Sequence, residues 1–424
     1  MLQLQVIREN PQEVIAALKK KHYAPAEENI NAILRLDAEK RSVQQELESV
    51  LQEVNRISKE IGLLFKQGEK EKADALKDQT ASLKERNKDL SAKVSELEEK
   101  IQNLLYSIPN TPHASVPEGR DAAENVIERQ VGQIDHLPAD ALPHWEIASR
   151  YDIIDFELGN KITGAGFPVY KGKGARLQRA LINFFLDRAV EAGYLEIEPP
   201  LMINEASGYG TGQLPDKDAQ MYQVGLDNYY LIPTAEVPVT NLYRDCLLQE
   251  KDLPVKNCAY SACFRREAGS YGKDVRGLNR LHQFDKVEIV RIEKPEDSYQ
   301  VLEEMCRHVG KLLEDLELTY RVVRLCGGDI SFTSALTFDF EVYSAAQQRW
   351  LEVSSVSNFE TYQANRLHLR YKNAEGKTRL LHTLNGSAIA LPRVVAALLE
   401  NHQCAEGVRM PKALQPYTGF ELLN

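Results

Sequence analysis

The sequence lacks the long apolar run of a membrane protein and the signal peptide of a secreted one. No stretch approaches the roughly 18 apolar residues that a membrane-spanning helix needs. The opening MLQLQVIRENPQEV has no basic stretch followed by an apolar core and a small-residue cleavage site. We therefore expect a cytoplasmic protein without a membrane partner. Its 43% hydrophobic and 27% charged residues are ordinary for a globular protein, which argues against a disordered chain.

Metal-binding cysteine patterns and a positive net charge are also absent. The six cysteines include no CxxC pair and have no histidine at metal-ligand spacing, so we expect reduced thiols and no structural zinc. The formal net charge of -10 argues against a protein that coats nucleic acid, and we expect no DNA partner. A local basic surface that docks one RNA stays compatible with this charge. A chain of 424 residues is too long for one compact core, which predicts two or three domains.

Proline is missing from residues 26–106, and glycine occurs there only at positions 62 and 68. Apolar residues recur at alternating spacings of three and four, from Ile33 to Leu64 and again from Leu76 to Leu104, which is a heptad pattern. The only plausible turn lies between these halves. The pattern therefore predicts an antiparallel two-helix coiled-coil arm. Its long helices are expected at about 27–66 and 70–106, within an N-terminal helical domain of residues 1–108.

The charge along this arm is uneven. Residues 26–106 contain 14 Lys and Arg against 17 Asp and Glu, whereas residues 56–88 around the turn contain nine against six. A basic tip suits contact with a phosphate backbone. The plainer alternative is a coiled coil that only holds an oligomer together.

The remainder of the chain, residues 109–424, mixes strand-like and helix-like segments, and the strands outnumber the interleaved helices. This predicts the α+β class, with a mostly antiparallel sheet flanked by helices rather than a doubly wound parallel sheet. The candidate strands are 194–203, 228–233, 256–265, 281–292, 337–343 and 349–357, and the candidate helices are 175–193, 296–316 and 388–401.

One segment concentrates positive charge in this acidic chain. Residues 264–289 read FRREAGSYGKDVRGLNRLHQFDKVEI and have the pattern of a β-hairpin with a glycine-rich loop. Because side chains alternate along a strand, Arg265 and Glu267 should share a face. These residue types together favour a nucleotide site. The arginine can bind a phosphate, the carboxylate can accept from an exocyclic amine, and the Phe284 ring can stack on a base. No stretch matches a Rossmann or Walker phosphate loop.

The same segment resembles motif 2 of the class II aminoacyl-tRNA synthetases, and most closely the version of the seryl-tRNA synthetases. AVEAGYLEIEPPL resembles motif 1, the dimer interface, and HTLNGSAIALPRVVAALLENHQ resembles motif 3. IPTAEVPVTNLY and LEVSSVSNFETYQANR are similar to segments distinctive of the seryl enzymes. The resemblance implies a class II catalytic domain over residues 109–424, with motifs 1, 2 and 3 at about 175–201, 256–292 and 382–403.

The implied reaction is activation of L-serine with ATP to seryl-adenylate, followed by transfer of the seryl group to the 3' end of tRNA(Ser), with tRNA(Sec) as a further substrate that the family allows. ATP is then a substrate, Mg²⁺ a cofactor, and the protein a homodimer through motif 1. One alternative is a paralogue that activates a small amino acid for a non-tRNA acceptor. Another is a coiled-coil scaffold protein with an inactive nucleotide fold, which the complete set of motif residues argues against.

The resemblance also implies roles for single residues. Arg265 is expected to bridge the α-phosphate and the serine carboxylate, and Arg393 to stack on adenine and reach the γ-phosphate; both are candidate catalytic residues. Glu267 is expected to accept from the adenine amino group, and Phe284 to stack on the other face of the base. The implied ATP-binding set is Arg265, Arg266, Glu267, Phe284, Glu352, Val353, Ser354, Ser355 and Arg393. Within it, Arg266 has no specific role.

Two further sets follow from the resemblance. Glu352 and Ser355 match the family's magnesium ligands, and oxygen donors suit this hard cation. The implied serine-binding set is Thr234, Ala235, Glu236, Arg265, Glu288, Asn385 and Ser387. Of the other basic residues in the hairpin, we expect Arg276 and Arg280 near phosphates, and Lys273 and Lys286 in solvent.

Overall fold

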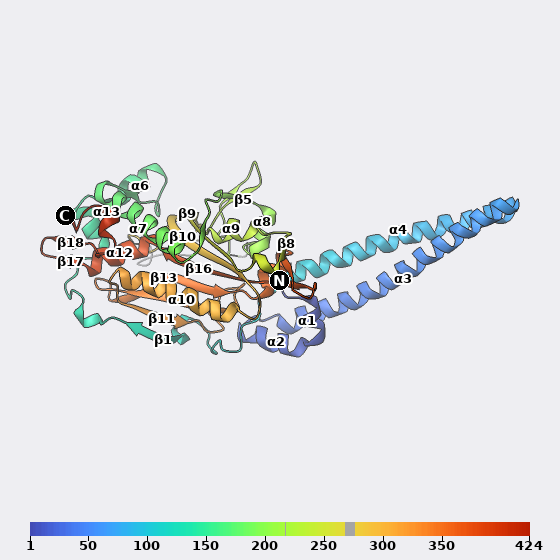
Figure 1. The fold of residues 1–424 in the computed structure, drawn as a ribbon, viewed down its shortest axis with the longest axis horizontal. Coiled ribbons are helices and arrows are strands. Elements are labelled where there is room, and N and C mark those ends of the chain that lie inside the picture. Colours follow the sequence, from blue (N-terminus) through green and yellow to red (C-terminus); the bar gives the residue numbers. More distant parts are fainter. Residues whose placement is uncertain (217, 268–275) are drawn as a thin grey trace. The chain divides into compact units, whose positions relative to one another are not determined.

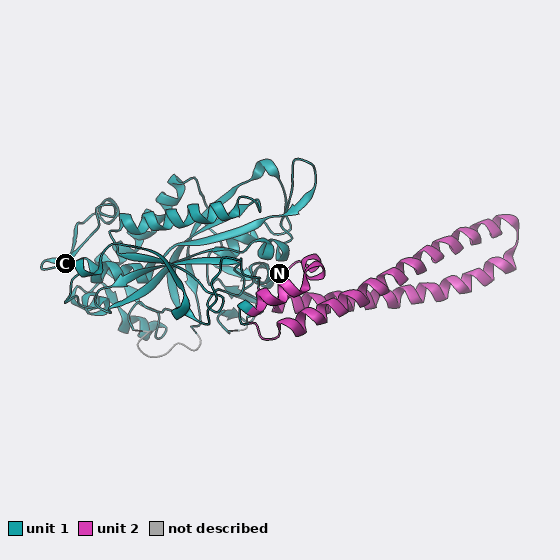
Figure 2. Ribbon diagram, turned by 90° about the horizontal axis from the view of Figure 1, so that it is seen from below, with its two compact units in different colours: residues 1, 20–22, 110–424 teal, residues 2–19, 23–109 magenta. Residues whose placement is uncertain are grey.

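The structure is a computed structural model that describes residues 1–216, 218–267 and 276–424. Lys273 and most of the predicted hairpin loop lie outside the described residues. The chain divides into two compact units, shown in Figure 2. Residues 2–19 and 23–109 form the helical unit, and Met1, residues 20–22 and residues 110–424 form the sheet unit.

Two long helices dominate the helical unit and run antiparallel to each other, as Figures 1 and 2 show. The turn between them is at Gly68, whose φ of +81° is a left-handed conformation that glycine adopts without strain. Apolar heptad positions of both helices are buried, among them Leu47, Ile57, Leu97 and Ile101. The helices are α1 (Leu4–Glu9), α2 (Pro11–Lys20), α3 (Ala26–Gln67) and α4 (Lys70–Ser107).

An eight-stranded sheet forms the centre of the sheet unit, with the strand order β1-β11-β12-β13-β16-β10-β9-β4. Every pairing is antiparallel except that of β4 with β9, which confirms the predicted α+β class. The strands are β1 (Val126–Val131), β4 (Leu195–Glu196), β9 (Val255–Phe264), β10 (Gln283–Glu293), β11 (Tyr320–Arg324), β12 (Leu336–Ser344), β13 (Arg349–Asn358) and β16 (His382–Ala390).

Three helices, α7 (Gly172–Glu191), α10 (Ser298–Asp315) and α12 (Leu391–Asn401), pack on this sheet through one large apolar core (Figure 1). On β10 this core takes Val287 and Ile289, whereas Val290 belongs to a separate cluster with α9 (Glu236–Asn241). Because side chains alternate along a strand, Lys286 and Glu288 lie on the face away from the large core. Polar groups are therefore collected on that face of β10.

No helix among the described residues is long and apolar enough to cross a membrane.

Shorter elements surround the sheet. The remaining helices are α5 (His144–Arg150), α6 (Phe156–Ile162), α8 (Glu205–Thr211), α11 (Thr361–Arg366), α13 (Gln415–Thr418) and the 3-10 turns Ala122–Glu124, Ile134–His136 and Glu250–Asp252. The remaining strands are β2 (Ile154–Asp155), β3 (Val169–Tyr170), β5 (Met202–Asn204), β6 (Gln223–Val224), β7 (Tyr229–Leu231), β8 (Leu247–Gln249), β14 (Arg370–Lys372), β15 (Thr378–Leu380), β17 (Gln403–Cys404), β18 (Gly407–Arg409) and β19 (Leu422–Leu423).

Two sequence predictions were wrong in detail. The stretch YLEIEPPLMI forms two short strands in different sheets, β4 and β5, because the two prolines between them cannot donate to a strand ladder. The last predicted helix begins at Leu391 rather than at residue 388, because residues 382–390 form the central strand β16. Pro392 suits the first turn of that helix, where a missing N–H costs nothing.

Candidate active site

A cleft in the sheet unit collects residues that are far apart in the sequence. Its lining comes from β10, β13 and β16, from the residues after β9 and from the start of α12. The predicted site residues that line it are Arg265, Glu267, Phe284, Glu352, Val353, Ser354, Ser387 and Arg393. Arg266 and Ser355 are not among the described residues that line this cleft.

At one end of the cleft, the aromatic end, the Arg265 guanidinium lies over the Phe284 ring, 5.3 Å from the ring centroid. Phe284 sits on β10 opposite Cys263 of β9, so strand pairing brings its ring beside Arg265. Arg265 Nε also donates to the Pro233 carbonyl at 3.4 Å. The planar guanidinium is thus oriented by an aromatic face and a backbone acceptor, with its remaining donors available for anions.

Glu267 is held in an uncommon backbone conformation, with φ at +48°. Its carboxylate forms an ion pair with Arg280 at 3.0 Å. We predicted Arg280 near phosphates. In the structure its contact is with Glu267, the carboxylate that we expect to accept a hydrogen bond from adenine. The ion pair orients this acceptor at the mouth of the cleft.

Arg393, at the start of α12, is held from two sides. Its Nε donates to the Asn279 carbonyl at 3.0 Å, and its Nη1 donates to the Glu352 carbonyl at 2.6 Å. The Glu352 carboxylate lies 3.7 Å from the same Nη1. The guanidinium is thus fixed between the segment that precedes β10 and strand β13.

Two buried carboxylates form the other end of the site. Glu236 is 7% exposed and Glu288 is fully buried, and Asn385 Nδ2 donates to both at 2.9 Å. Thr234 Oγ1 donates to Glu288 Oε2 at 3.2 Å. Ser387 is paired with Glu288 across β10 and β16. A pair of carboxylates beside short hydroxyls in a buried cluster suits a small ligand that carries an ammonium group.

Gln363, which the sequence did not single out, supports Glu236 from behind. Its Nε2 donates to Glu236 Oε1 at 2.7 Å, and its own Oε1 accepts from Thr383 Oγ1 at 2.7 Å. Burial and the neighbouring Glu288 raise the pKa of Glu236 to about 7. Glu236 is therefore about half ionised near neutral pH, and a cation bound beside it would favour the ionised form.

The prediction that Lys286 faces solvent was wrong. Lys286 is 5% exposed, lines the cleft and lies 2.5 Å from Glu288 Oε2. The alternation along β10 carried this signal, since Phe284, Lys286 and Glu288 are spaced two apart. Lys286 thus lies between the aromatic end and the acidic end of the site.

A third carboxylate lies beside the proposed magnesium pair. Asp339 of β12 is opposite Ser355 of β13, and its Oδ1 is buried without a hydrogen-bond partner in the described part of the chain. Burial, and then the charge of Glu352, raise the pKa of Asp339 well above its usual value. Sequence patterns gave no reason to select Asp339, because its proximity to Glu352 depends on the pairing of β12 with β13.

Known protein families match both the N-terminal helical region and the region that contains the cleft. The family model described as the tRNA synthetase class II core domain (G, H, P, S and T) matches residues 221–402, which include every described residue that lines the cleft. The fold and the site define a class II aminoacyl-tRNA synthetase. The model described as the seryl-tRNA synthetase N-terminal domain matches residues 1–112.

Individual relatives narrow the assignment. The serine–tRNA ligase of Chlorobaculum parvum is 46% identical over the full length of both chains, and that of Salinibacter ruber is 57% identical over 74% of each. The crystal structure of seryl-tRNA synthetase from Pyrococcus horikoshii complexed with ATP is 36% identical, with a TM-score of 0.93 over 100% of this chain and 99% of that one. The chain belongs to the seryl-tRNA synthetase family.

Proposed function

We propose that this protein activates L-serine with ATP to seryl-adenylate and transfers the seryl group to the 3' end of tRNA(Ser), with tRNA(Sec) as a further candidate acceptor. The observation that carries the proposal is the buried cluster of Glu236, Glu288 and Asn385. It adjoins the cleft that Arg265 and Phe284 line, because Lys286 lines that cleft and contacts Glu288. Relatives named serine–tRNA ligase and a relative complexed with ATP support it. None of these names favours a non-tRNA acceptor. Because its proposed substrates are tRNA and ATP, we propose that the protein acts in the cytoplasm.

The first step joins two anions. A serine carboxylate oxygen attacks the α-phosphorus of ATP, and pyrophosphate leaves. Catalysis therefore requires positioning of the reactants and neutralisation of charge on the α-phosphate. Arg265 supplies a planar fork that can bridge the carboxylate and the α-phosphate. Lys286, between the aromatic and acidic ends, supplies a second positive charge close to the reacting groups.

The acidic end supplies the selection for serine. An ammonium group is attracted by Glu236 and Glu288, and a small hydroxyl finds partners in Thr234, Ser387 and the carboxylates. Alanine would leave these buried groups unpaired, and sites built to bind a hydroxyl reject such analogues by roughly 10⁴-fold. Ala235 is fully buried and packs in the small apolar cluster that includes Val239 and Val290.

The function is tested by ATP–pyrophosphate exchange across a panel of serine, threonine, alanine, glycine and cysteine, followed by charging of total tRNA. We expect exchange with serine to exceed that with alanine by roughly 10⁴-fold, for the reason of unpaired polar groups. Exchange with alanine or glycine in preference to serine would contradict the proposed substrate. Exchange without charging of any tRNA would instead favour a paralogue with another acceptor.

Serine binding should depend on pH through Glu236. Its pKa of about 7 means that it is largely protonated below neutrality, and the protonated form cannot pair with an ammonium. Between pH 8 and pH 6 we expect the Kd of serine to rise about tenfold, in step with the loss of the ionised form. Calorimetry at pH 6 in two buffers of different ionisation enthalpy should show release of about one proton for each serine bound.

The control for this prediction is Glu236→Gln, which should bind serine weakly and without the same pH step. A serine Kd that is constant between pH 6 and pH 8 in the unchanged protein would remove Glu236 from ammonium recognition.

We propose that Mg²⁺ is held by Glu352 and Ser355, with Asp339 as a supporting carboxylate. The unpartnered Oδ1 of Asp339, opposite Ser355, fits this, because a buried oxygen without a donor is suited to a cation. Among the described residues no three His, Cys, Asp or Glu side chains gather as a metal site, so ATP phosphates and water would complete the shell. The ion would neutralise phosphate charge as the adenylate forms.

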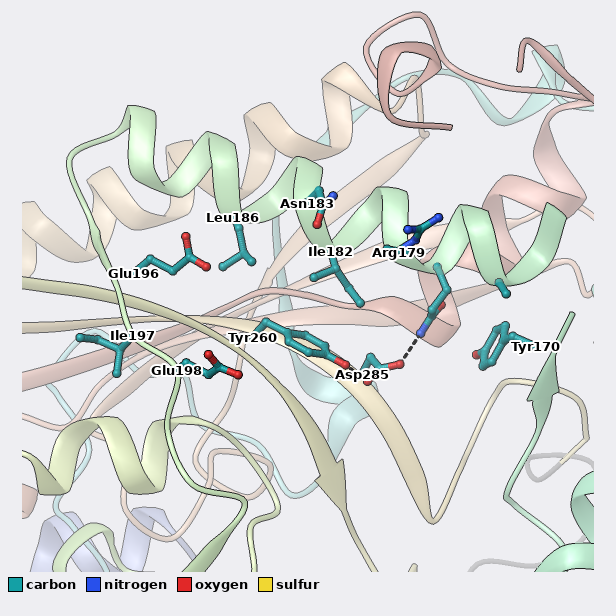
Figure 3. Close-up of a pocket in the computed structure, with 12 residues that line it drawn as sticks. Tyr170, Arg179, Ile182, Asn183, Leu186, Glu196, Ile197, Glu198, Tyr260 and Asp285 are labelled. Atoms are coloured by element: carbon teal, nitrogen blue, oxygen red, sulfur yellow. Dashed lines mark hydrogen bonds between the residues drawn. The ribbon is translucent and has the colours of Figure 1, made fainter. Parts of the chain in front are cut away.

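We propose that the protein is a homodimer through motif 1. Beside α7 lies a cavity of about 580 Å³, and Figure 3 shows Arg179 and Ile182 of the helix together with Tyr260 and Asp285 of the sheet around it. Strand β4 is the last strand of the sheet order, and Leu195 on it is 62% exposed. An open edge with exposed apolar side chains is suited to cover by a second copy.

We propose that the helical arm, about residues 26–106, binds tRNA. Its turn region carries the excess of basic residues, and these include Lys77, whose Nζ lies 4.5 Å from the centroid of the Phe65 ring. Lysines beside an exposed aromatic ring suit contact with RNA phosphates and bases.

A further inference from the structure

A buried polar pair has no role among the site residues that the resemblance implied, although one member, Glu400, lies within the motif 3 segment. His144, at the start of α5, and Glu400, in the last turn of α12, are both fully buried. Glu400 Oε1 accepts from His144 Nδ1 at 2.8 Å and from the His144 backbone N–H at 3.1 Å. A buried carboxylate is costly unless it is well supplied with donors, so this pair calls for a physical reason.

The other side of the His144 ring contacts the segment that leads into β10. The Leu278 backbone N–H donates to His144 Nε2 at 2.8 Å, so Nε2 is an acceptor and the ring hydrogen is on Nδ1. Gly277, with φ at +66°, lies so close that a Cβ atom there would be 2.2 Å from Nε2. Only glycine permits this approach.

Glu400 also reaches Asn279 by a second route. Gln347 Nε2 donates to Glu400 Oε1 at 3.2 Å, and Gln347 Oε1 accepts from Asn279 Nδ2 at 3.0 Å. Asn279 is therefore held through its backbone neighbour Leu278 and through its own side chain. Both routes end on the same buried carboxylate.

Asn279 is the point where this network meets the candidate active site. Its carbonyl accepts from Arg393 Nε at 3.0 Å, and it lines the cleft next to Arg280. A displaced Asn279 carbonyl would release one of the two acceptors that hold the Arg393 guanidinium. Small displacements of positioning groups are costly in such sites.

We infer that Glu400 and His144 are positioning residues for the nucleotide: they fix Asn279, and through it the Arg393 guanidinium, at the adenine end of the cleft. This inference rests on the proposed function only in taking the cleft as the ATP site. Neither residue is among the described residues that line the cleft. Their effect is confined to the adenine end, because the proposed serine site depends on Glu236, Glu288 and Asn385.

The experiment measures ATP binding by calorimetry and, separately, the KM values for ATP and serine in exchange. His144→Asn keeps a donor near Nδ1 for Glu400 but removes the acceptor for Leu278. We expect it to weaken ATP binding roughly 10-fold, as for loss of a buried hydrogen bond, and to leave the serine KM within about twofold. Glu400→Gln, whose amide oxygen still accepts from His144, should retain most of the ATP affinity.

Gly277→Ala disturbs the same contact between His144 Nε2 and residues 277–278, because the added Cβ would collide with the ring. It should weaken ATP binding to a similar extent. This variant therefore tests the inference if His144→Asn does not fold. The inference would be overturned if His144→Asn and Gly277→Ala weakened the binding of ATP and of serine equally, or if both left the ATP affinity unchanged. Calorimetry with ATP alone needs no amino acid. A failure of the serine assignment therefore leaves this test intact.

Discussion

Replacement of Arg265 by alanine is expected to lower serine-dependent ATP–pyrophosphate exchange by roughly 10³-fold, the upper range for loss of one preorganised donor at a developing charge. Arg265 lines the cleft and, in the described structure, contacts the Phe284 ring and the Pro233 carbonyl. These contacts are weak, so the free energy of unfolding should change by only about 1 kcal/mol. Exchange and thermal unfolding of the same preparation measure both quantities.

Two matched variants sharpen this result. Arg265→Lys keeps the charge but not the planar fork, and should stay strongly impaired if the fork bridges two anions. Arg266→Ala alters the neighbouring arginine, which does not line the cleft in the described structure, and should be far milder. Exchange retained in Arg265→Ala, or equal losses at both positions, would remove Arg265 from the centre of the mechanism.

Shortening the arm is expected to separate the two half-reactions. Removal of residues 50–63 from α3 and 75–88 from α4 takes two heptads from each helix and keeps the turn at Gly68. At 1.5 Å per residue the arm loses about 21 Å. Exchange should stay within about twofold of the unchanged protein, because the cleft lies in the other unit. Charging of tRNA(Ser) should fall by roughly 10²-fold as phosphate contacts are lost.

A charge variant tests whether the tip acts through phosphates. With Lys66, Lys70 and Lys72 replaced by glutamine at full length, tRNA charging should fall in part and become less sensitive to salt, because fewer counterions are released. If the shortened arm charges tRNA normally, the tRNA-binding role is wrong. A simultaneous change in sedimentation would then favour the alternative of an oligomerisation coiled coil.

Local sequence patterns were sufficient to predict those features of the structure that depend on residues close together in the sequence. The heptads of residues 26–106 and the glycine between them predicted the hairpin of α3 and α4, because coiled-coil packing repeats every seven residues. The expectation that alternation places Arg265 and Glu267 on one face did not apply, because β9 ends at Phe264 and Glu267 has a φ of +48°. On β10, Phe284 and Glu288 are an even number of residues apart and therefore share a face. The same alternation should have placed Lys286 with them.

Predictions were weakest where a residue depends on contacts with distant segments. Residues 382–390 were not recognised as a strand, because β16 is buried on both faces between β13 and β10 and has no simple polar alternation. The support of Glu236 by Gln363, 127 positions away, depends on the packing of α11 beside α8 and β16. No local pattern reports such a contact.

By itself, the sequence determined the class of fold, the helical hairpin and the types of residue at the aromatic end of the cleft, since these follow from periodicity and from motifs of adjacent residues. The tertiary structure decided which charges are buried and what they contact. It brought Glu236 and Glu288 onto one Asn385 amide, buried Lys286 against Glu288, and joined Glu400 to Arg393 through Asn279. The physical reason is that burial and pairing of charge depend on segments that meet only when the sheet is formed.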